Sequence, residues 1–170
     1  QSRPEFHFAL ETKDFGSLAE DFVALGVRLH FCPAPTDAAQ SVRGFADVLA
    51  RQGPFHAVHC HTHYASPFSL ALARWAGVPA LVAHSHADFS RQAKQIGRRC
   101  YREFSRRILG PLANRKLAVS EAAARDLFGH TGQATIMPCG FAVDRFCVER
   151  RPRRGEFNVV HVGRLVPEKN

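Results

Sequence analysis

The chain has 170 residues, of which 45% are hydrophobic and 22% are charged. This composition is that of a globular protein and excludes a disordered one, and the length allows one domain with a core. No apolar run approaches the roughly 20 residues that a membrane-spanning helix requires. The net charge of +8 favours anionic partners, which include phosphorylated substrates, anionic lipids and nucleic acid.

The five cysteines are scattered along the chain and form no C-x-x-C pair. Their odd number and irregular spacing argue against a disulfide framework or a zinc knuckle and favour a reducing compartment. The chain opens at Gln1, shows no secretory signal pattern and soon enters the apolar stretch FHFAL. We therefore expect that further residues precede it.

Strand-type and helix-type runs alternate along the first 138 residues. Periodicity and punctuation by Gly and Pro predict strands at 6–10, 27–32, 56–61, 78–85, 115–120 and 134–138, and helices at 15–26, 41–53, 67–77, 90–109 and 120–129. The first helix is expected to bury Leu18, Phe22 and Leu25, and Pro67 and Gly77 are expected to begin and end the third. Single helices between strands imply parallel crossovers, so the sequence predicts an α/β fold with a Rossmann-like, doubly wound parallel sheet.

The segment at 139–156, CGFAVDRFCVERRPRRGE, breaks this alternation because it is rich in Gly, Pro and charge. Such a composition is typical of a linker between domains. The run FNVVHV that follows it has the composition of a strand. We therefore predict a first domain at 1–138, a linker at 139–156 and the start of a second domain at 157–170.

Alternating histidines stand at the ends of two predicted strands: His59, His61 and His63 in VHCHTH, and His84 and His86 in HSHAD. Residues at i and i+2 of a strand share a face, so the first three are expected to point the same way. Imidazoles at this spacing are familiar metal ligands in hydrolases. Alternatively, they are polar side chains that face the crevice at the carboxyl ends of parallel strands, without a metal.

The predicted helix at 90–109 is strongly basic, and its arginines include Arg98, Arg99, Arg102, Arg106 and Arg107. One face is expected to carry an apolar stripe made of Ile96, Cys100, Phe104, Ile108 and Leu109. The helix is expected either to be a solvated surface helix packed on the sheet or to attach to an anionic membrane surface. Nucleic-acid binding has less support, because no aromatic platform or motif accompanies the charge.

Two further segments have the features of helix starts and anion sites. In AVSEAAARDLFG, Ser120 can cap a helix, and Glu121 suits the positive end of its dipole. In VVHVGRLVPEKN, a predicted strand runs into Gly163, and Arg164 and Lys169 follow where they could grip an anion. Taken alone, the first segment is equally a plain capped helix, and the second is equally a loop with two solvated cations.

Taken in order, four segments resemble GT-B fold glycosyltransferases of the family 4 type, also called glycosyltransferase group 1. HAVHCHTHYAS with ALARWAGVPALVAHSHA is similar to the middle of that family's acceptor domain, and LAVSEAAARDLFG is similar to a segment late in it. ATIMPCGFAVDRF is similar to its PNG-hydrophobic-D-x-x-x-F passage, with Cys139 where Asn is usual. VGRLVPEKN is similar to its VGRL-x-x-x-KG loop, with Asn170 where Gly is usual.

The resemblance implies an incomplete GT-B acceptor domain followed by the first strand of a donor domain. The family's Gly-rich acceptor loop would precede Gln1, and its paired-glutamate motif would follow Asn170. The implied reaction is retaining transfer of a sugar from a nucleotide-diphosphate donor to a hydroxyl acceptor, in bacterial exopolysaccharide, lipopolysaccharide or other glycoconjugate synthesis. The chain by itself is expected to be inactive, because half of the donor site would be absent.

The resemblance also implies roles for residues. Either His86 or His84 would face the transferred sugar as the catalytic histidine, with a preference for His86. The donor diphosphate would be held by Gly163, Arg164 and Lys169, and the acceptor side would be lined by His61, His63, Ser120 and Glu121. No metal or other cofactor is implied, because fixed cations and a helix N-terminus can stabilise the leaving group.

The implied partners are a nucleotide-sugar donor, a sugar or lipid-linked acceptor and an anionic membrane surface, and they include no nucleic acid. The implied location is the cytoplasm, with peripheral attachment to the inner face of the plasma membrane through the basic helix. Two other functions compete with this one. The first is a metal-dependent hydrolase that uses His59, His61, His84 and His86, and the second is a non-catalytic module that binds anions or membranes.

Overall fold

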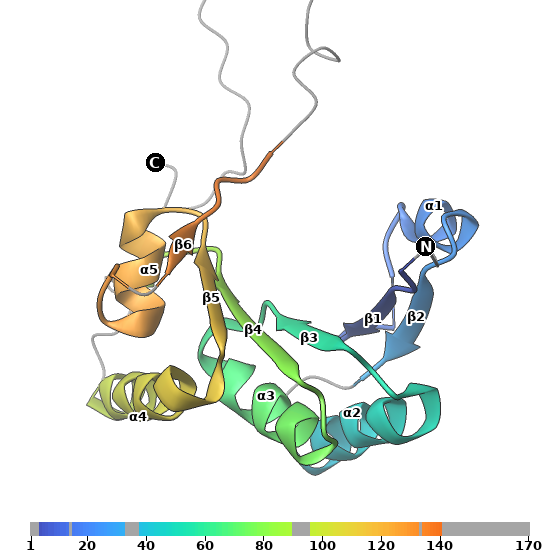
Figure 1. Cartoon of the computed structure of the whole chain (residues 1–170), viewed down its shortest axis with the longest axis horizontal. Coiled ribbons are helices and arrows are strands. Elements are labelled where there is room, and N and C mark those ends of the chain that lie inside the picture. Colours follow the sequence, from blue (N-terminus) through green and yellow to red (C-terminus); the bar gives the residue numbers. More distant parts are fainter. Residues whose placement is uncertain (1–3, 14, 33–37, 90–95, 133, 141–170) are drawn as a thin grey trace, which may run out of the picture. The chain divides into compact units, whose positions relative to one another are not determined.

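The structure of the chain, a computed structural model, describes residues 4–13, 15–32, 38–89, 96–132 and 134–140 (Figure 1). The chain divides into two units, Gln1–Cys139 and Gly140–Asn170, and the helices and strands below all belong to the first. Most of the predicted linker and all of the predicted start of a second domain lie outside the described residues. The predicted domain boundaries therefore stay predictions.

Helices and strands alternate along the first unit, as the sequence predicts. In chain order they are β1 (His7–Leu10), α1 (Ala19–Ala24), β2 (Arg28–Phe31), α2 (Ala38–Gln52), β3 (Ala57–Cys60), the 3-10 helix η1 (His63–Ala65), α3 (Ser66–Trp75), β4 (Ala80–Ser85), α4 (Ile96–Leu112), β5 (Arg115–Ala118), α5 (Glu121–Phe128) and β6 (Thr135–Ile136). Strands β1 and β2 pair in parallel, and β3, β4, β5 and β6 form a parallel sheet in that order. The Rossmann-like α/β prediction is confirmed, because helices join the successive parallel strands of the larger sheet.

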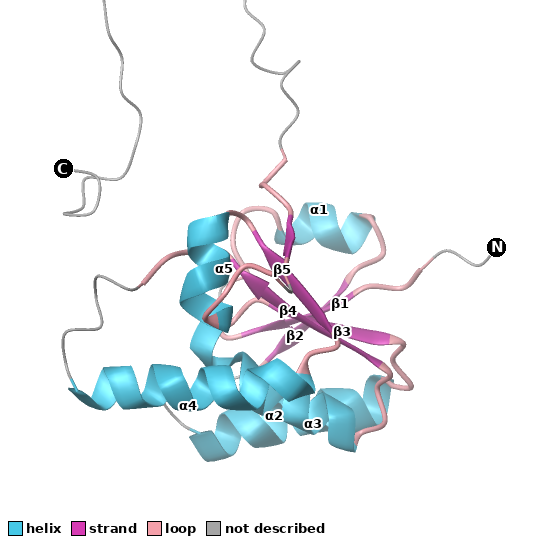
Figure 2. Cartoon of the chain, turned by 60° about the vertical axis from the view of Figure 1, so that its left-hand side comes forward, coloured by secondary structure: helices cyan, strands magenta, loops and turns pink. Residues whose placement is uncertain are grey.

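The helices α2, α3 and α4 lie side by side beneath the strands, and α5 packs against α4, β4 and β5 (Figure 2). The best-buried large side chains come from these layers and are at most 1% exposed: Leu70, Leu81, Leu109 and Leu127. Full burial of a leucine side chain stabilises a fold by about 1.5–3 kcal/mol, so these residues anchor the strands between the helices. None of the helices that the structure describes has the length and apolarity that crossing a bilayer demands.

Local signals at the helix ends act as predicted. Helix α5 begins after Ser120, whose Oγ accepts a hydrogen bond from the Ala123 N–H at 3.2 Å, as an N-cap does. It ends at Gly129, whose φ of 80° is a left-handed conformation that glycine adopts at little cost. Pro67 lies in the first turn of α3, and Gly77 follows the end of that helix with a φ of 81°.

The predicted apolar face of the first helix is largely wrong. Helix α1 is so short that Leu18 and Leu25 lie at its caps, where they are 58% and 76% exposed. Phe22 does pack, because its ring meets the ring of Phe8 on β1 edge to face with centroids 5.2 Å apart. A two-stranded sheet offers little apolar surface, so a single aromatic pair occupies much of it.

The predicted apolar stripe of the basic helix is buried only near its end. Three members of its expected apolar stripe are exposed to solvent: Ile96, Cys100 and Phe104. The buried residues of α4 are Leu109, which belongs to that stripe, and Ser105, which does not. Successive residues turn by about 100° around a helix, so burial of this side directs the 96, 100 and 104 row outward. Arg102 and Arg106 turn inward with the buried side, because a buried carboxylate faces them.

Candidate functional site

The histidines at the carboxyl ends of β3 and β4 form one group. In the parallel register His59 pairs with Val82, so His61 falls beside His84 on the same face of the sheet. Nε2 of His59 is 3.2 Å from Nδ1 of His84, and Nδ1 of His61 is 2.6 Å from Nε2 of His86. We call these four residues, His59, His61, His84 and His86, the histidine cluster.

The rings of the histidine cluster lie close together, with His59 stacked on His84 and the other pairs tilted. The centroids of neighbouring rings are 4.2 to 5.2 Å apart. Open α/β sheets bind their ligands in the crevice at the carboxyl ends of the strands, which is where this cluster lies. The sequence prediction that these two histidine motifs meet at one edge is therefore confirmed for the four residues of the cluster.

Two rings of the cluster, those of His61 and His84, are kept neutral by their surroundings. His84 is 4% exposed, and its Nε2 atom has no hydrogen-bond partner within the described residues. Burial, followed by the charges of the neighbouring histidines, lowers the pKa of His61 to about 4 and the pKa of His84 to about 4. Both rings are therefore uncharged at neutral pH. Of these two rings only His84 is buried, since the side chains of His61 and of His86 are both exposed.

His63 does not join the cluster, so the shared-face prediction holds for His59 and His61 and is wrong for His63. Strand β3 ends at Cys60, and His63 begins η1 with a φ of 52°. Its ring lies instead beside Asp126, where its Nε2 is 3.0 Å from Oδ2 of the carboxylate. Burial lowers the pKa of His63, although the hydrogen bond and the charge of Asp126 act in the opposite direction.

A carboxylate that no motif predicted, that of Asp126 on α5, lies at the centre of this region and is 3% exposed. The Tyr64 hydroxyl donates to its Oδ1 at 2.7 Å, and the backbone N–H of Phe89 donates to its Oδ2 at 2.9 Å. A sequence signal for this residue does exist. Asp126 directly precedes Leu127 on the buried side of the predicted helix, and a buried acid needs partners there.

Two arginines of α4 balance the buried charge. Guanidinium nitrogens of Arg102 and Arg106 lie 3.9 Å and 3.8 Å from Oδ1 of Asp126. Arg106 also donates from Nε to the Asp126 carbonyl oxygen at 2.8 Å and from Nη2 to the Arg125 carbonyl oxygen at 3.1 Å. These carbonyls belong to the last turn of α5, where the helix dipole favours a positive charge. The pairing explains why α4 turns two arginines inward.

Asp126 connects the segments that follow the two histidine-bearing strands. The segment after β3 reaches the carboxylate through His63 and Tyr64, and the segment after β4 reaches it through the amide of Phe89. All three contacts come within three residues of the histidine cluster along the chain. The carboxylate therefore holds the two segments that leave the cluster in a fixed relation to each other.

The remaining predicted acceptor-side residues make local contacts. Ser120 caps α5, and Glu121 forms an exposed ion pair with Arg125 in which Nη1 and Oε2 are 3.2 Å apart. Their role toward an acceptor stays a prediction. The residues predicted to hold the donor diphosphate lie outside the described part of the chain: Gly163, Arg164 and Lys169.

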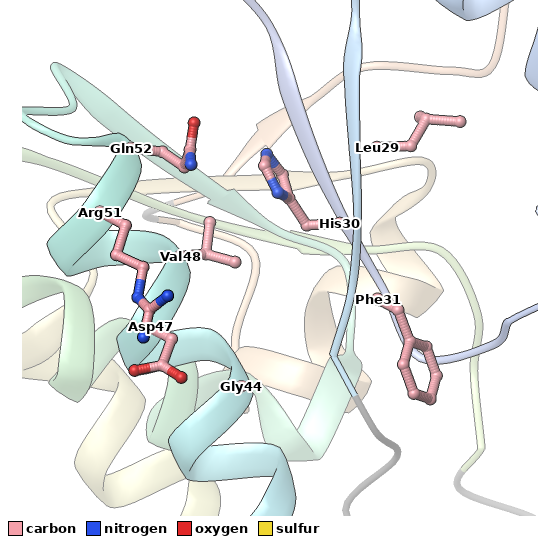
Figure 3. Close-up of a pocket in the computed structure, with 8 residues that line it drawn as sticks. All are labelled: Leu29, His30, Phe31, Gly44, Asp47, Val48, Arg51 and Gln52. Carbon is pink, nitrogen blue, oxygen red and sulfur yellow. The ribbon is translucent and has the colours of Figure 1, made fainter.

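A separate pocket lies between β2 and α2 (Figure 3). His30 points toward α2 from the strand, while Asp47 and Arg51 line the pocket from the helix. His30 is already engaged by His7 of β1, whose Nδ1 is 3.0 Å from Nε2 of His30. No sequence motif predicted this pocket, and it shares no residue with the histidine cluster.

The parallel sheet and the polar cluster at its strand ends define a Rossmann-like domain with a ligand edge. Residues 8–140 match the family described as "Glycosyl transferase 4-like domain". The chain therefore belongs to the glycosyltransferase 4-like family, and the resemblance found in the sequence is confirmed. The competing interpretation as a metal-dependent hydrolase is not favoured.

Similar proteins are known both by sequence and by structure. "Putative glycosyltransferase EpsF" of Bacillus subtilis (strain 168) is 28% identical over 186 aligned residues, which cover 100% of this chain and 48% of EpsF. Crystal structures of Anabaena Alr3699/HepE with UDP and with UDP-glucose have TM-scores of 0.60 and 0.59 against this chain, at 13% and 15% identity. Each match covers 81% of this chain and 37% of HepE. The chain thus spans about half the length of EpsF and less of HepE, and likeness to HepE shows the fold alone.

Proposed function

We propose that this chain is part of a glycosyltransferase that moves a sugar from a nucleotide-diphosphate donor to a hydroxyl acceptor with retention of configuration. The observation that carries the proposal is the histidine cluster at the carboxyl ends of β3 and β4, in a domain of a glycosyltransferase family. HepE was crystallised with UDP and with UDP-glucose, which supports a nucleotide-sugar donor here. We assign the reaction to bacterial exopolysaccharide, lipopolysaccharide or other glycoconjugate synthesis.

In the proposed reaction the bond between the anomeric carbon of the sugar and the diphosphate oxygen breaks. A bond from that carbon to the acceptor oxygen forms on the same face, the diphosphate leaves with the electron pair, and its leaving oxygen takes the proton of the acceptor hydroxyl. An imidazole beside the sugar offers a hydrogen-bonding nitrogen to the charge that develops. Because His86 is exposed and His84 is buried, we assign the sugar-facing role to His86 and a supporting role to His84.

The acceptor side is assigned first to His61, because its Nδ1 is 2.6 Å from Nε2 of the sugar-facing His86. His63 is held by Asp126, and we assign to it the shaping of this side of the site. Ser120 and Glu121 complete the proposed acceptor side at the start of α5.

The diphosphate is assigned to Gly163, Arg164 and Lys169. Fixed cations stabilise a leaving diphosphate without a metal, so the proposed transfer uses no cofactor. In the full-length protein, Arg164→Ala and Lys169→Ala should each weaken UDP-glucose binding at least about tenfold, because a hydrogen bond to a charged group contributes about 1.5–3 kcal/mol. Arg153→Ala in the predicted linker is the matched control. Unchanged affinity and turnover in both variants would refute the assignment.

We also propose that the 170-residue chain is inactive alone. It covers 48% of EpsF, so much of a complete two-domain site would come from outside it. Sugar transfer from UDP-glucose by the purified chain, above the rate of a buffer blank, would contradict this proposal.

The membrane surface is assigned to the outer side of α4. Arg99 and Arg107 are exposed there with the outward-facing Ile96 and Phe104, whereas Arg98 is also exposed but lies in the row of Arg102, Ser105 and Leu109. Apolar side chains flanked by arginines favour the surface of an anionic bilayer. Two arginines originally expected on that surface, Arg102 and Arg106, are left out of this assignment because they pair with a buried carboxylate. The proposed location is therefore the cytoplasm, with peripheral attachment to the inner face of the plasma membrane and a sugar or lipid-linked acceptor.

A further inference from the structure

The histidine cluster has a capacity that the proposed sugar transfer does not use. One ring nitrogen from each of His59, His61 and His84 lies within 4.8 Å of the other two. From this geometry we infer that these three histidines form a binding site for one transition-metal ion of the Zn²⁺ class. The ion takes no part in the transfer, in which the proposed Arg164 and Lys169 stabilise the diphosphate.

The nitrogens are close to the spacing that a metal ion requires. Zn–N bonds are about 2.0–2.1 Å long, so two nitrogens on one tetrahedral ion lie about 3.3 Å apart. His59 and His84 already place two nitrogens 3.2 Å apart. The His61 ring is next to both, with centroids 4.2 Å from His59 and 5.2 Å from His84. The His61 nitrogen lies within 4.8 Å of the other two, so it has to approach them for all three to reach one ion.

The surroundings of the three rings support a ligand. His86 supplies an outer partner, since its Nε2 is 2.6 Å from Nδ1 of His61, and such partners fix the orientation of a metal-binding imidazole.

The chemistry of the ligands selects the class of ion. Imidazole nitrogens suit Zn²⁺, Ni²⁺, Cu²⁺ and Co²⁺, whereas Mg²⁺ and Ca²⁺ prefer oxygen ligands. Three protein ligands leave one position of a tetrahedral ion for water or an anion. Because His61 and His84 also belong to the proposed sugar edge, the ion and the sugar would compete for this space. Metal binding is therefore to be measured without any donor.

The experiment uses the 170-residue chain purified without a polyhistidine tag. ZnCl₂ is titrated against the chain in competition with a chromophoric zinc chelator, and NiCl₂ and MgCl₂ are titrated in parallel. The variants are His59→Ala and His61→Ala, because both side chains are exposed and their removal opens no buried cavity. His30→Ala is the matched control, since it removes one ring from the other stacked histidine pair, whose centroids are 5.1 Å apart.

We expect the wild-type chain to bind one Zn²⁺ and Mg²⁺ not to compete for the site. Each cluster variant should bind Zn²⁺ at least tenfold more weakly, and His30→Ala should bind it as the wild type does. The wild-type titration alone can overturn the inference, because failure to hold one Zn²⁺ per chain refutes it whatever the variants do. Equal loss in His30→Ala, or no loss in folded cluster variants as judged by circular dichroism, also refutes it. Since no nucleotide sugar is present, each of these failures leaves the proposed transferase function intact.

Discussion

At the scale of single residues, Asp126 has the largest structural effect near the candidate site. Its buried carboxylate receives hydrogen bonds from a tyrosine hydroxyl and a backbone amide, and it pairs with two arginines. Removal of one partner from a buried charge network leaves the other charges uncompensated, which costs far more than the loss of an exposed pair.

The first prediction compares two acids on the same helix. Asp126→Ala should lower the free energy of unfolding of the chain by about 3 kcal/mol, because it leaves two half-buried guanidinium groups and the Tyr64 hydroxyl without their buried partner. Glu121→Ala removes only an exposed ion pair with Arg125 and should cost less than about 1 kcal/mol. Urea unfolding followed by circular dichroism measures both. Similar losses in the two variants would show that the Asp126 network contributes no special stability.

Two residue-scale predictions from the sequence had different outcomes for identifiable reasons. The period of a strand correctly places His59 and His61 on one face, because both precede the turn. The same period fails for His63, because the strand ends at Cys60 and a positive φ redirects the chain. Alternation in a sequence does not reveal where a strand stops, so the partner of His63 could not be predicted from its own motif.

At the scale of elements, α4 is the helix whose role changes most. Its apolar and basic residues are the ones that the sequence predicts for an amphipathic helix, but the side it buries is different. Periodicity shows which residues share a side, and it does not show which side meets the core when both carry apolar residues. Here a buried acid on a neighbouring helix decides, because it attracts Arg102 and Arg106.

The second prediction tests this orientation of α4. Leu109→Ala should destabilise the chain by about 2–5 kcal/mol, because it leaves a cavity in the core. Phe104→Ala removes a larger side chain that is 53% exposed, and it should cost distinctly less. Guanidinium chloride unfolding of the two variants provides the measurement, and a larger loss for Phe104→Ala would show that the row of Ile96, Cys100 and Phe104 is the buried one.

The third prediction concerns the outer side of the same helix. Each arginine near an anionic bilayer contributes about 1 kcal/mol, so Arg99→Gln with Arg107→Gln should reduce partitioning onto phosphatidylglycerol vesicles by about tenfold or more. Co-sedimentation at low salt provides the measurement. Arg125→Gln, on α5, is the control and should bind like the wild type. If binding does not depend on anionic lipid, or if the double variant binds as well as the control, α4 has no membrane role.

At the scale of the whole molecule, the fold was more predictable than the site. The alternation of strands and helices can be predicted from the hydrophobic periodicity and from the positions of prolines and glycines. The parallel sheet follows because a single helix connects each strand to the next. The histidine motifs were predictable because strand ends in such a sheet share one edge. Asp126 was not predicted, because its partners come from segments far apart in sequence, such as Tyr64 and Arg106. The predicted diphosphate loop at the end of the chain lies outside the described residues.

The central claim is that the β3–β4 edge faces the sugar during transfer, and the turnover of a His86 variant tests it most directly. The full-length protein, with the nucleotide sugar that it turns over fastest, is compared with His86→Ala and with His56→Ala, an exposed histidine outside the cluster. A positioned group at a reacting centre contributes about 10²–10⁴-fold to the rate. The His86→Ala variant should therefore turn over at least about 100-fold more slowly and bind UDP as tightly as the wild type. The His56→Ala variant should keep wild-type activity. Wild-type turnover by His86→Ala would contradict the account.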